Sequence, residues 1–286
     1  PAFAMDWQIY LAISIVFSSV AVLLQRILLH KDNTDPIAYA VLFEGLVGLI
    51  LLAAAVINGI KLPDFSLYAV PIIATFLAFA FGNIAYAKSL KAVDASIFSV
   101  LFATNAVWVM IGGVLLFNEK VSVAQFFGAA LILLSVILLA DRTGKFKLDR
   151  GMLLGLLCGV FYGVGILGWV YISKRSDLLT WNALTFLVPS LFIFLFMPKS
   201  ASKMRPFLRQ PVLGRILLLC LLVSTSSAFL LNAFNNYNAS IISPLIQTEV
   251  FLTVLLAIVF LHERDNLRMK LIAAAFCMGG VVLIVS

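Results

Sequence analysis

Charged side chains are scarce in this chain of 286 residues, because Asp, Glu, Lys and Arg together make up only 12% of it. Hydrophobic residues make up 63%, and the mean hydropathy is +1.11. A soluble protein of this size could not cover so much apolar surface. The composition therefore predicts an integral membrane protein.

Histidine and cysteine are rare as well. The two histidines, His30 and His262, fall at expected membrane interfaces, and no His/Glu cluster has the spacing of a metal site. The three cysteines stand singly in apolar stretches, which excludes a complete disulfide framework. No G-x-x-x-x-G-K-[ST] loop is present, so ATP-driven transport by this chain alone is not expected. We expect no cofactor and no metal, and nothing favours a nucleic acid as a partner.

Long apolar runs are abundant. A membrane-spanning helix needs about 20 mostly apolar residues, and runs of this kind predict an all-α protein with ten transmembrane helices. The expected ranges are 7–29, 36–57, 67–90, 94–117, 121–140, 151–173, 180–197, 212–235, 240–261 and 267–285. The loops between them are short, so no soluble domain is expected.

The chain repeats itself at an offset of 144 residues. Ala95–Asn105 aligns with Ala239–Glu249, and six of these eleven positions are identical. Without a gap, Asn118-Glu119-Lys120 then aligns with His262-Glu263-Arg264. Duplication of a membrane segment is typical of transporters whose binding site lies where two halves meet.

The repeat divides the chain into a first half over residues 5–140 and a second half over 151–286, joined by a basic linker over 141–150. Residues 1–4 precede Met5 and are expected to be a tag remnant. Each half has five expected helices, and an odd number makes the second half enter the membrane with opposite polarity. We therefore expect inverted repeats related by a pseudo-two-fold axis in the membrane plane, within one compact membrane domain.

Basic residues are unevenly distributed over the expected loops. Of the 20 lysines and arginines, only Lys61, Lys120, Lys174 and Arg175 lie on the side of the even-numbered loops. Because basic loops stay in the cytoplasm, this bias places the odd-numbered loops there and both termini outside. We expect a multi-pass protein of the plasma (inner) membrane.

Two carboxylates lie deep inside expected spans: Glu44 within the second, and Glu249 near the middle of the ninth. A charge at a helix centre costs roughly 2.5–3.5 kcal/mol on insertion scales, so such residues usually face a cavity or a partner. Neither recurs in the repeat, since Glu249 aligns with Asn105 and Glu44 with Val188. An asymmetric solute contacts two halves differently, and Glu249 is our first candidate. A protonated carboxyl bonded to a neighbouring helix is the structural alternative.

Other polar and aromatic side chains inside the spans complete the candidate site. Asn83 and Tyr86 are three residues apart and share a helix face, as do Asn105 and Trp108. Trp108 and Trp169 lie well inside spans, where an aromatic wall beside a carboxylate would suit an organic cation or an amino acid. The remaining candidates are Tyr162, seven residues before Trp169, and Gln247. Ordinary packing is the alternative for the aromatic residues.

Local motifs predict structural roles elsewhere. Glu119 and Glu263 recur at helix ends and are expected to bind loop backbone or basic neighbours. Ser122 and Gln125 have the spacing of a helix capping box. Gly155, Gly159 and Gly163 are spaced to let another helix approach closely.

These motifs resemble the drug/metabolite transporter superfamily, and within it the ten-helix EamA-like transporters. The resemblance is carried by Ala-Ser-Ile-x-Ser at Ala95 and Ala239 and by the helix ends at Glu119 and Glu263. It implies transport of solutes such as amino acids, sugars, nucleotide sugars, polyamines or choline-like cations. Members are often described with both termini in the cytoplasm, the reverse of the charge count.

The leading hypothesis is a secondary transporter that moves a small organic metabolite, such as an amino acid or amine, by alternating access, with proton coupling open. A uniporter or exchanger would have the same helices. A flippase for a lipid-linked substrate is the alternative, because the 199–215 loop is basic. A membrane-embedded enzyme and a scaffold rank below both. The expected partners are the solute, the bilayer and, if transport is coupled, protons; the protein is expected to be a monomer or homodimer.

Overall fold

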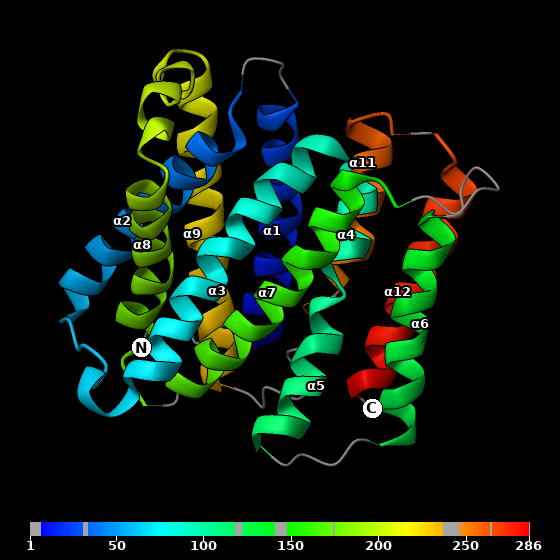
Figure 1. Ribbon diagram of the computed structural model, residues 1–286, viewed down its shortest axis with the longest axis horizontal. Helices are drawn as coiled ribbons and strands as arrows, with labels where there is room; N and C mark the ends of the chain where they lie inside the picture. Colours follow the sequence, from blue (N-terminus) through cyan, green and yellow to red (C-terminus); the bar gives the residue numbers. More distant parts are fainter. Residues whose placement is uncertain are drawn as a thin grey trace.

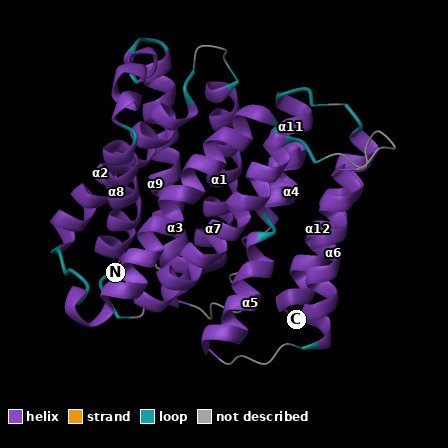
Figure 2. Cartoon of the chain, in the orientation of Figure 1, coloured by secondary structure: helices purple, strands orange, loops and turns teal. Residues whose placement is uncertain are grey.

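A computed structural model describes residues 7–30, 34–117, 122–140, 148–173, 175–236, 246, 248–263 and 265–285. It is a bundle of helices that run in roughly the same two opposed directions (Figure 1). No strand occurs in these ranges (Figure 2). The all-helical expectation is thus confirmed for the part of the chain that is described.

The helices follow one another with short connections. They are α1 (Trp7–Leu29), α2 (Pro36–Asn58), α3 (Phe65–Ala92), α4 (Ala95–Phe102), α5 (Asn105–Phe117), α6 (Val123–Ala140), α7 (Arg150–Ser173), α8 (Leu178–Phe196), the 3-10 helices η1 (Pro198–Lys203) and η2 (Arg205–Leu208), α9 (Val212–Asn236), α11 (Thr248–Phe260) and α12 (Leu267–Val285). Within the described residues, seven helical stretches are long and apolar enough to cross a membrane. The count of ten spans stays a prediction.

Polar residues fix where several helices begin. Asp35 accepts hydrogen bonds from the N–H groups of Ile37 and Ala38 at the start of α2, and Asp64 caps α3 in the same way. The predicted capping box of α6 is confirmed, because Ser122 and Gln125 bond to each other's backbone N–H. These bonds satisfy donors that a helix cannot satisfy internally.

Asp35 also holds an ion pair, with Lys203 of η1 at 2.7 Å. Burial by itself would raise the pKa of Asp35. The hydrogen bonds from Lys203 and from the backbone outweigh burial and hold that pKa below its ordinary value.

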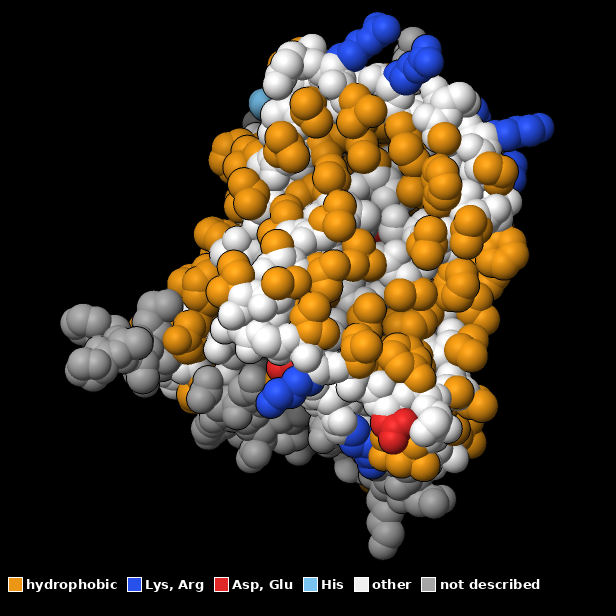
Figure 3. Space-filling view, turned by 90° about the vertical axis from the view of Figure 1, so that its left-hand side faces the viewer, with side chains coloured by type: hydrophobic (Ala, Val, Ile, Leu, Met, Phe, Trp, Pro, Cys, Tyr) orange, Lys and Arg blue, Asp and Glu red, His pale blue; other side chains and the backbone are white. Residues whose placement is uncertain are grey.

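The outer surface of the bundle is apolar. Leu49, Val70, Leu115 and Leu191 are each more than half exposed, as expected of side chains that face lipid. Figure 3 shows a band of hydrophobic side chains along one face, with lysines and arginines mainly at the upper end and both basic and acidic side chains at the lower end. We call the upper end, which contains η1, η2 and the junctions α3–α4 and α11–α12, the basic end.

The helices pair across the chain rather than only with their neighbours in sequence. α3 packs along α7 and α1 along α9, while α2 packs along α8. α6 and α12 form a further pair at one edge of the bundle (Figure 1). This arrangement leaves α1, α2, α3, α7, α8, α9 and α11 around the interior.

The expected continuous helix over 94–117 was wrong, because the chain turns at Ala103 and Thr104 and forms two helices, α4 and α5. The turn carries its own hydrogen bonds: the Thr104 hydroxyl donates to the Leu101 carbonyl, and the Asn105 amide donates to that of Phe102. The break leaves these carbonyls without a helical partner, and the two side chains satisfy them inside the protein. Lipid would offer them no donor.

Small residues on α7 make room for this turn, as their spacing predicted. A Cβ on Gly159 would lie 2.2 Å from the Thr104 hydroxyl oxygen, and one on Gly163 would lie 2.4 Å from the Trp108 Cβ. Real Cβ atoms do not come so close, so glycine is required for α7 to touch the α4–α5 turn.

Candidate functional site

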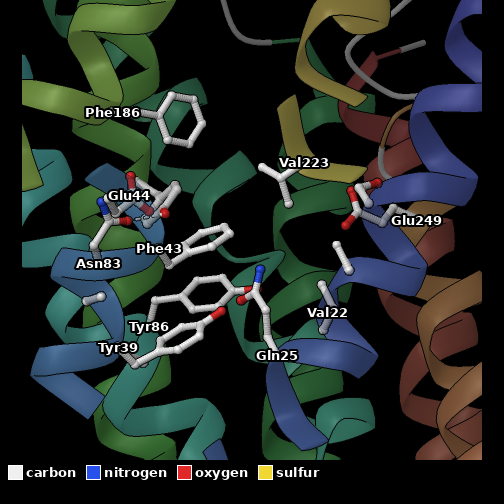
Figure 4. A pocket seen from close by; sticks show the side chains of 15 residues that line it. Val22, Gln25, Tyr39, Phe43, Glu44, Asn83, Tyr86, Phe186, Val223 and Glu249 are labelled. Atoms are coloured by element: carbon white, nitrogen blue, oxygen red, sulfur yellow. Dashed lines mark hydrogen bonds between the residues drawn. The ribbon is translucent and has the colours of Figure 1, made fainter. Parts of the chain in front are cut away.

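A cavity of about 170 Å³ lies between the central helices. It is lined from both halves of the sequence by α1, α2, α3, α7, α8, α9 and α11 (Figure 4). Five predicted site residues meet there: Glu44, Asn83, Tyr86, Tyr162 and Glu249. The prediction that each would bind substrate has not been tested, but their convergence from four helices follows directly from the structure.

Glu44 projects from α2 and is only 5% exposed. Asn83 of α3 lies against the Glu44 carboxylate (Figure 4). The Tyr162 hydroxyl of α7 donates in turn to the Asn83 side-chain oxygen. A row of polar groups thus runs from α7 through α3 to the Glu44 carboxylate of α2 at the cavity wall.

Glu249 approaches the cavity from the opposite wall (Figure 4). It lies in the first turn of α11, and the expected helix before it falls largely outside the described residues, so its place near the middle of a long helix stays a prediction. Ser18 of α1 lies near the Glu249 carboxylate, and the Ser18 hydroxyl donates to the Ile15 carbonyl at 3.1 Å. A helix N-terminus carries partial positive charge, which stabilises a carboxylate in its first turn.

Aromatic rings and two further polar groups make up the rest of the wall. Tyr39, Phe43 and Phe186 line the cavity, and Tyr86 packs edge-on against Phe98 with ring centroids 4.5 Å apart. Gln25 of α1 also lines it. Gln25 and Tyr39 were absent from the predicted site, although a glutamine inside an apolar span was a usable signal.

The charge of the lining is of one sign. Two glutamates reach the cavity, and the described residues that line it include no lysine, arginine or histidine. In a medium of low dielectric, uncompensated carboxylates attract a cation or a proton strongly. The cavity can therefore hold a positively charged group between aromatic faces.

The other four predicted site residues either lie away from the cavity or fall outside the residues that the structure describes. Asn105 is 3% exposed and bonds to the α4–α5 turn, and Trp108 is 39% exposed beside Gly163. The Trp169 carbonyl accepts from the Trp181 indole in a separate apolar cluster. None of the three lines the cavity, and Gln247 lies outside the described residues. No group of three or more potential metal ligands occurs among the residues that are described.

A packed layer separates the cavity from the basic end. Beyond Gln25, Tyr39 and Tyr86 along their helices, Leu29, Ala38 and Leu90 are fully buried. This layer closes the cavity at that end.

Above the layer lies a charged cluster, formed by Arg26, Asp94, Glu263 and Lys270. Lys270 is 2% exposed and reaches Asp94 at 2.7 Å, and Arg26 donates to the carbonyls of Leu90 and Lys91 at 2.7 Å. Glu263 accepts from the N–H groups of Ala95 and Ser96 at 2.8 and 3.0 Å and thereby caps α4. The expected structural role of Glu263 is confirmed; that of Glu119 lies outside the described residues. The cluster joins α1, α3 and α4 to the loop between α11 and α12.

The model of the EamA-like transporter family matches residues 5–140 and matches again over 149–286. The chain belongs to the EamA-like transporter family. It is therefore a multi-pass membrane transporter of the drug/metabolite type, as its sequence motifs suggested. Members of this family are transporters rather than enzymes.

Two further similarities accompany the family match. An uncharacterized protein of Methanocaldococcus jannaschii is 28% identical over 137 residues, which is 48% of this transporter and 97% of that protein. A solved crystal structure of a protein aligns over 94% of this transporter and 95% of its own chain, with a TM-score of 0.55 and 16% identity. At that identity the likeness shows the fold alone.

Proposed function

We propose that this protein is a secondary transporter for a small organic solute that carries a cationic nitrogen, such as an amine or an amino acid. The observation that carries the proposal is the cavity that contains Glu44 and Glu249 and no basic side chain among its described lining residues. Burying a carboxylate without a counter-charge is costly, so each carboxylate favours an ammonium group or a proton beside it. Tyr86 and Tyr162 supply π faces for the same cation.

The size of the cavity favours a metabolite over a lipid-linked substrate. Pockets for drug-sized ligands occupy roughly 300–1,000 Å³, whereas this one has about 170 Å³. A nucleotide sugar or a lipid-linked sugar exceeds that space and is also anionic. Both size and charge therefore argue against the flippase alternative.

Alternating access between two inverted five-helix halves, 5–140 and 151–286 with a linker over 141–150, is the proposed mechanism. Two observations support such halves: the family model matches twice, and the archaeal relative has the length of one half. The helix pairs support it too. If the two halves exchange places, α7 corresponds to α1 and α3 to α9, so the packing of α7 on α3 corresponds to that of α1 on α9. The pair formed by α2 and α8 corresponds to itself.

The charge distribution supports a cytoplasmic location for the basic end, in the plasma membrane, with both termini outside. The packed layer and the charged cluster would then close the cytoplasmic side. The conformation described here would be one in which a solute reaches the cavity from outside. The opposite conformation would require the charged cluster to separate.

The test is ligand binding by purified protein, read as a thermal shift against amines, amino acids, choline-like cations, sugars and nucleotide sugars. A ligand that binds only the folded state raises the melting temperature by mass action. We expect amines or amino acids to stabilise the protein, and Glu44→Gln and Glu249→Gln to weaken the effect. Asp64→Asn changes a fully exposed carboxylate outside the cavity and is the matched control.

Flux in proteoliposomes then distinguishes the transport modes. Accumulation driven by an inward-directed proton gradient indicates proton–solute symport, and accumulation driven by an outward-directed gradient indicates proton–solute exchange. Loss of either in Glu249→Gln or Glu44→Gln identifies the residue that carries the proton. Flux that follows only the solute gradient indicates a uniporter or exchanger. Stabilisation by anionic solutes alone, retained in both variants, would contradict the proposal.

A further inference from the structure

Two buried polar atoms at one end of the cavity have no hydrogen-bond partner. They are the Gln25 side-chain oxygen and the Tyr39 hydroxyl. Gln25 is 5% exposed and Tyr39 is 2% exposed. Both residues line the cavity that contains the carboxylates, and Figure 4 draws both of them below Glu44 and Glu249.

Such atoms are uncommon in folded proteins. More than nine-tenths of buried polar groups have a partner, and an unmade hydrogen bond in the interior costs free energy. Here two occur on α1 and α2, and both side chains line the same cavity. A bound group that both donates and accepts would supply the partners that they lack.

We propose that Gln25 and Tyr39 form a second subsite, which binds a neutral hydrogen-bonding group of the solute while the carboxylates hold its cationic nitrogen. The inference rests on the proposed function for the cationic part. It adds that the solute has two polar ends, and that the second end is a hydroxyl or a primary amide.

The chemistry of the two atoms selects that group. A hydroxyl or a primary amide both donates and accepts, so it can bond to an amide oxygen and to a phenol together. A carboxylate has no proton to donate to the Gln25 oxygen, and no basic residue among the described lining would balance its charge. A second ammonium would lack a carboxylate at this end.

The spacing of the subsites requires an extended solute. Tyr39 and Glu44 are both on α2, five residues apart, which is a rise of about 7.5 Å along a helix. The Phe43 ring lies between them in sequence and stacks on Tyr39, with centroids 5.5 Å apart. Phe43 and Val22 give the middle of the cavity an apolar wall, which suits a run of methylene groups.

The test compares two series of probes that differ in one group. The first series runs from 2-aminoethanol to 5-amino-1-pentanol, and the second contains the alkylamine with the same number of non-hydrogen atoms. Affinities are measured for purified protein by competition or calorimetry. We expect the longer amino alcohols to bind about tenfold more tightly than their alkylamine partners, since one satisfied hydrogen bond in a buried site is worth about that much.

Variants separate the two subsites. In Gln25→Leu and in Tyr39→Phe, each amino alcohol should bind about as tightly as its alkylamine partner. The affinity for the alkylamine should stay within about twofold of the wild-type value. Glu44→Gln should weaken both series by the same factor and keep the ratio of the two affinities. Tyr10→Phe removes a hydroxyl that is not part of the cavity lining and is the matched control.

Each outcome decides one claim. Equal affinities in the wild type, or a preference that survives in both Gln25→Leu and Tyr39→Phe, would overturn the subsite and indicate that water satisfies these atoms. Loss of all binding in Glu44→Gln, together with tighter binding of amino alcohols than of alkylamines by the wild type, supports both the proposed function and the subsite. No binding of any amine to the wild type would contradict the proposed function, and with it the subsite.

Discussion

At the scale of single residues, Asn83 has the most consequential position in the cavity wall. Its side chain faces Glu44 on one side and accepts from Tyr162 on the other. An amide can do both because it carries a donor and an acceptor. Asn83 thereby lies between the buried carboxylate of Glu44 and the buried phenol of Tyr162. Without Asn83, both groups would lose this polar neighbour.

This arrangement predicts coupling between Asn83 and Tyr162. Asn83→Leu should lower the free energy of unfolding by about 1–3 kcal/mol, because it leaves a buried hydroxyl and a buried carboxylate without their partner. Tyr162→Phe alone should cost about 1 kcal/mol. The double variant should be less unstable than the sum of the two, when unfolding is measured in detergent. Additive losses would show that the two side chains do not interact.

At the scale of elements, close contact between α7 and the α4–α5 turn positions Tyr162 at the cavity. Gly159 and Gly163 face the turn, whereas Tyr162 lies between them in sequence and points to α3. A broken helix inside a membrane needs internal hydrogen bonds, and Thr104 and Asn105 supply them. The turn and the glycines therefore depend on each other.

A methyl group at Gly159 tests this contact. Gly159→Ala should destabilise the protein by about 1–3 kcal/mol, because the new Cβ overlaps the Thr104 hydroxyl. Adding Thr104→Ala should restore part of the loss. Gly279→Ala in α12 is the control, since its nearest neighbour is 3.8 Å away and alanine favours a helix. Equal melting temperatures for Gly159→Ala and Gly279→Ala would contradict the contact.

The charged cluster predicts unequal effects of two Asp→Asn changes. Asp94→Asn removes the carboxylate that faces the ammonium of Lys270, which is 2% exposed, and should cost about 3 kcal/mol. Asp35→Asn removes a carboxylate that faces Lys203, whose side chain is 59% exposed, and asparagine still caps α2. That change should cost less than about 1 kcal/mol. Similar losses would mean that Lys270 does not depend on Asp94.

The pH dependence of Asp35 has a defined sign. Its folded pKa is lowered, so its stabilising effect is present above the unfolded pKa of about 3.9 and is lost as the pH falls through the lower folded value. The difference in unfolding free energy between wild type and Asp35→Asn should be constant from about pH 8 to 5 and decrease as the pH falls below about 4. A difference that grows on acidification would contradict the lowered pKa.

At the scale of the whole molecule, the two ends differ in charge and the middle is apolar, which is the pattern of a protein oriented by its loops. The cavity lies between helices from both halves of the sequence. A charged cluster and a packed layer close it at the basic end.

Labelling of single cysteines tests the proposed orientation. The native Cys158, Cys220 and Cys277 are buried and should not react with a membrane-impermeant maleimide. Lys61→Cys should react in intact cells, and Ser202→Cys, at the basic end, only after permeabilisation. The reverse pattern would place the termini in the cytoplasm.

The sequence by itself determined the membrane class, the family and the approximate range of most helices. Lipid imposes a minimum length of apolar chain, so composition and run length carry that information. It also selected Glu44, Asn83, Tyr86, Tyr162 and Glu249, because polar groups inside a span are costly unless they face a cavity or a partner.

Only the tertiary structure decided which of these residues meet. Asn105 lies at the turn between α4 and α5, and Trp108 and Trp169 pack outside the cavity, although all three lie as deep in sequence as Glu44. Gln25 and Tyr39 line the cavity because of how α1 and α2 pack with the other central helices, and periodicity along one helix does not show which face meets another. Depth in the membrane is a property of sequence position, but the direction in which a side chain points depends on how the helices pack.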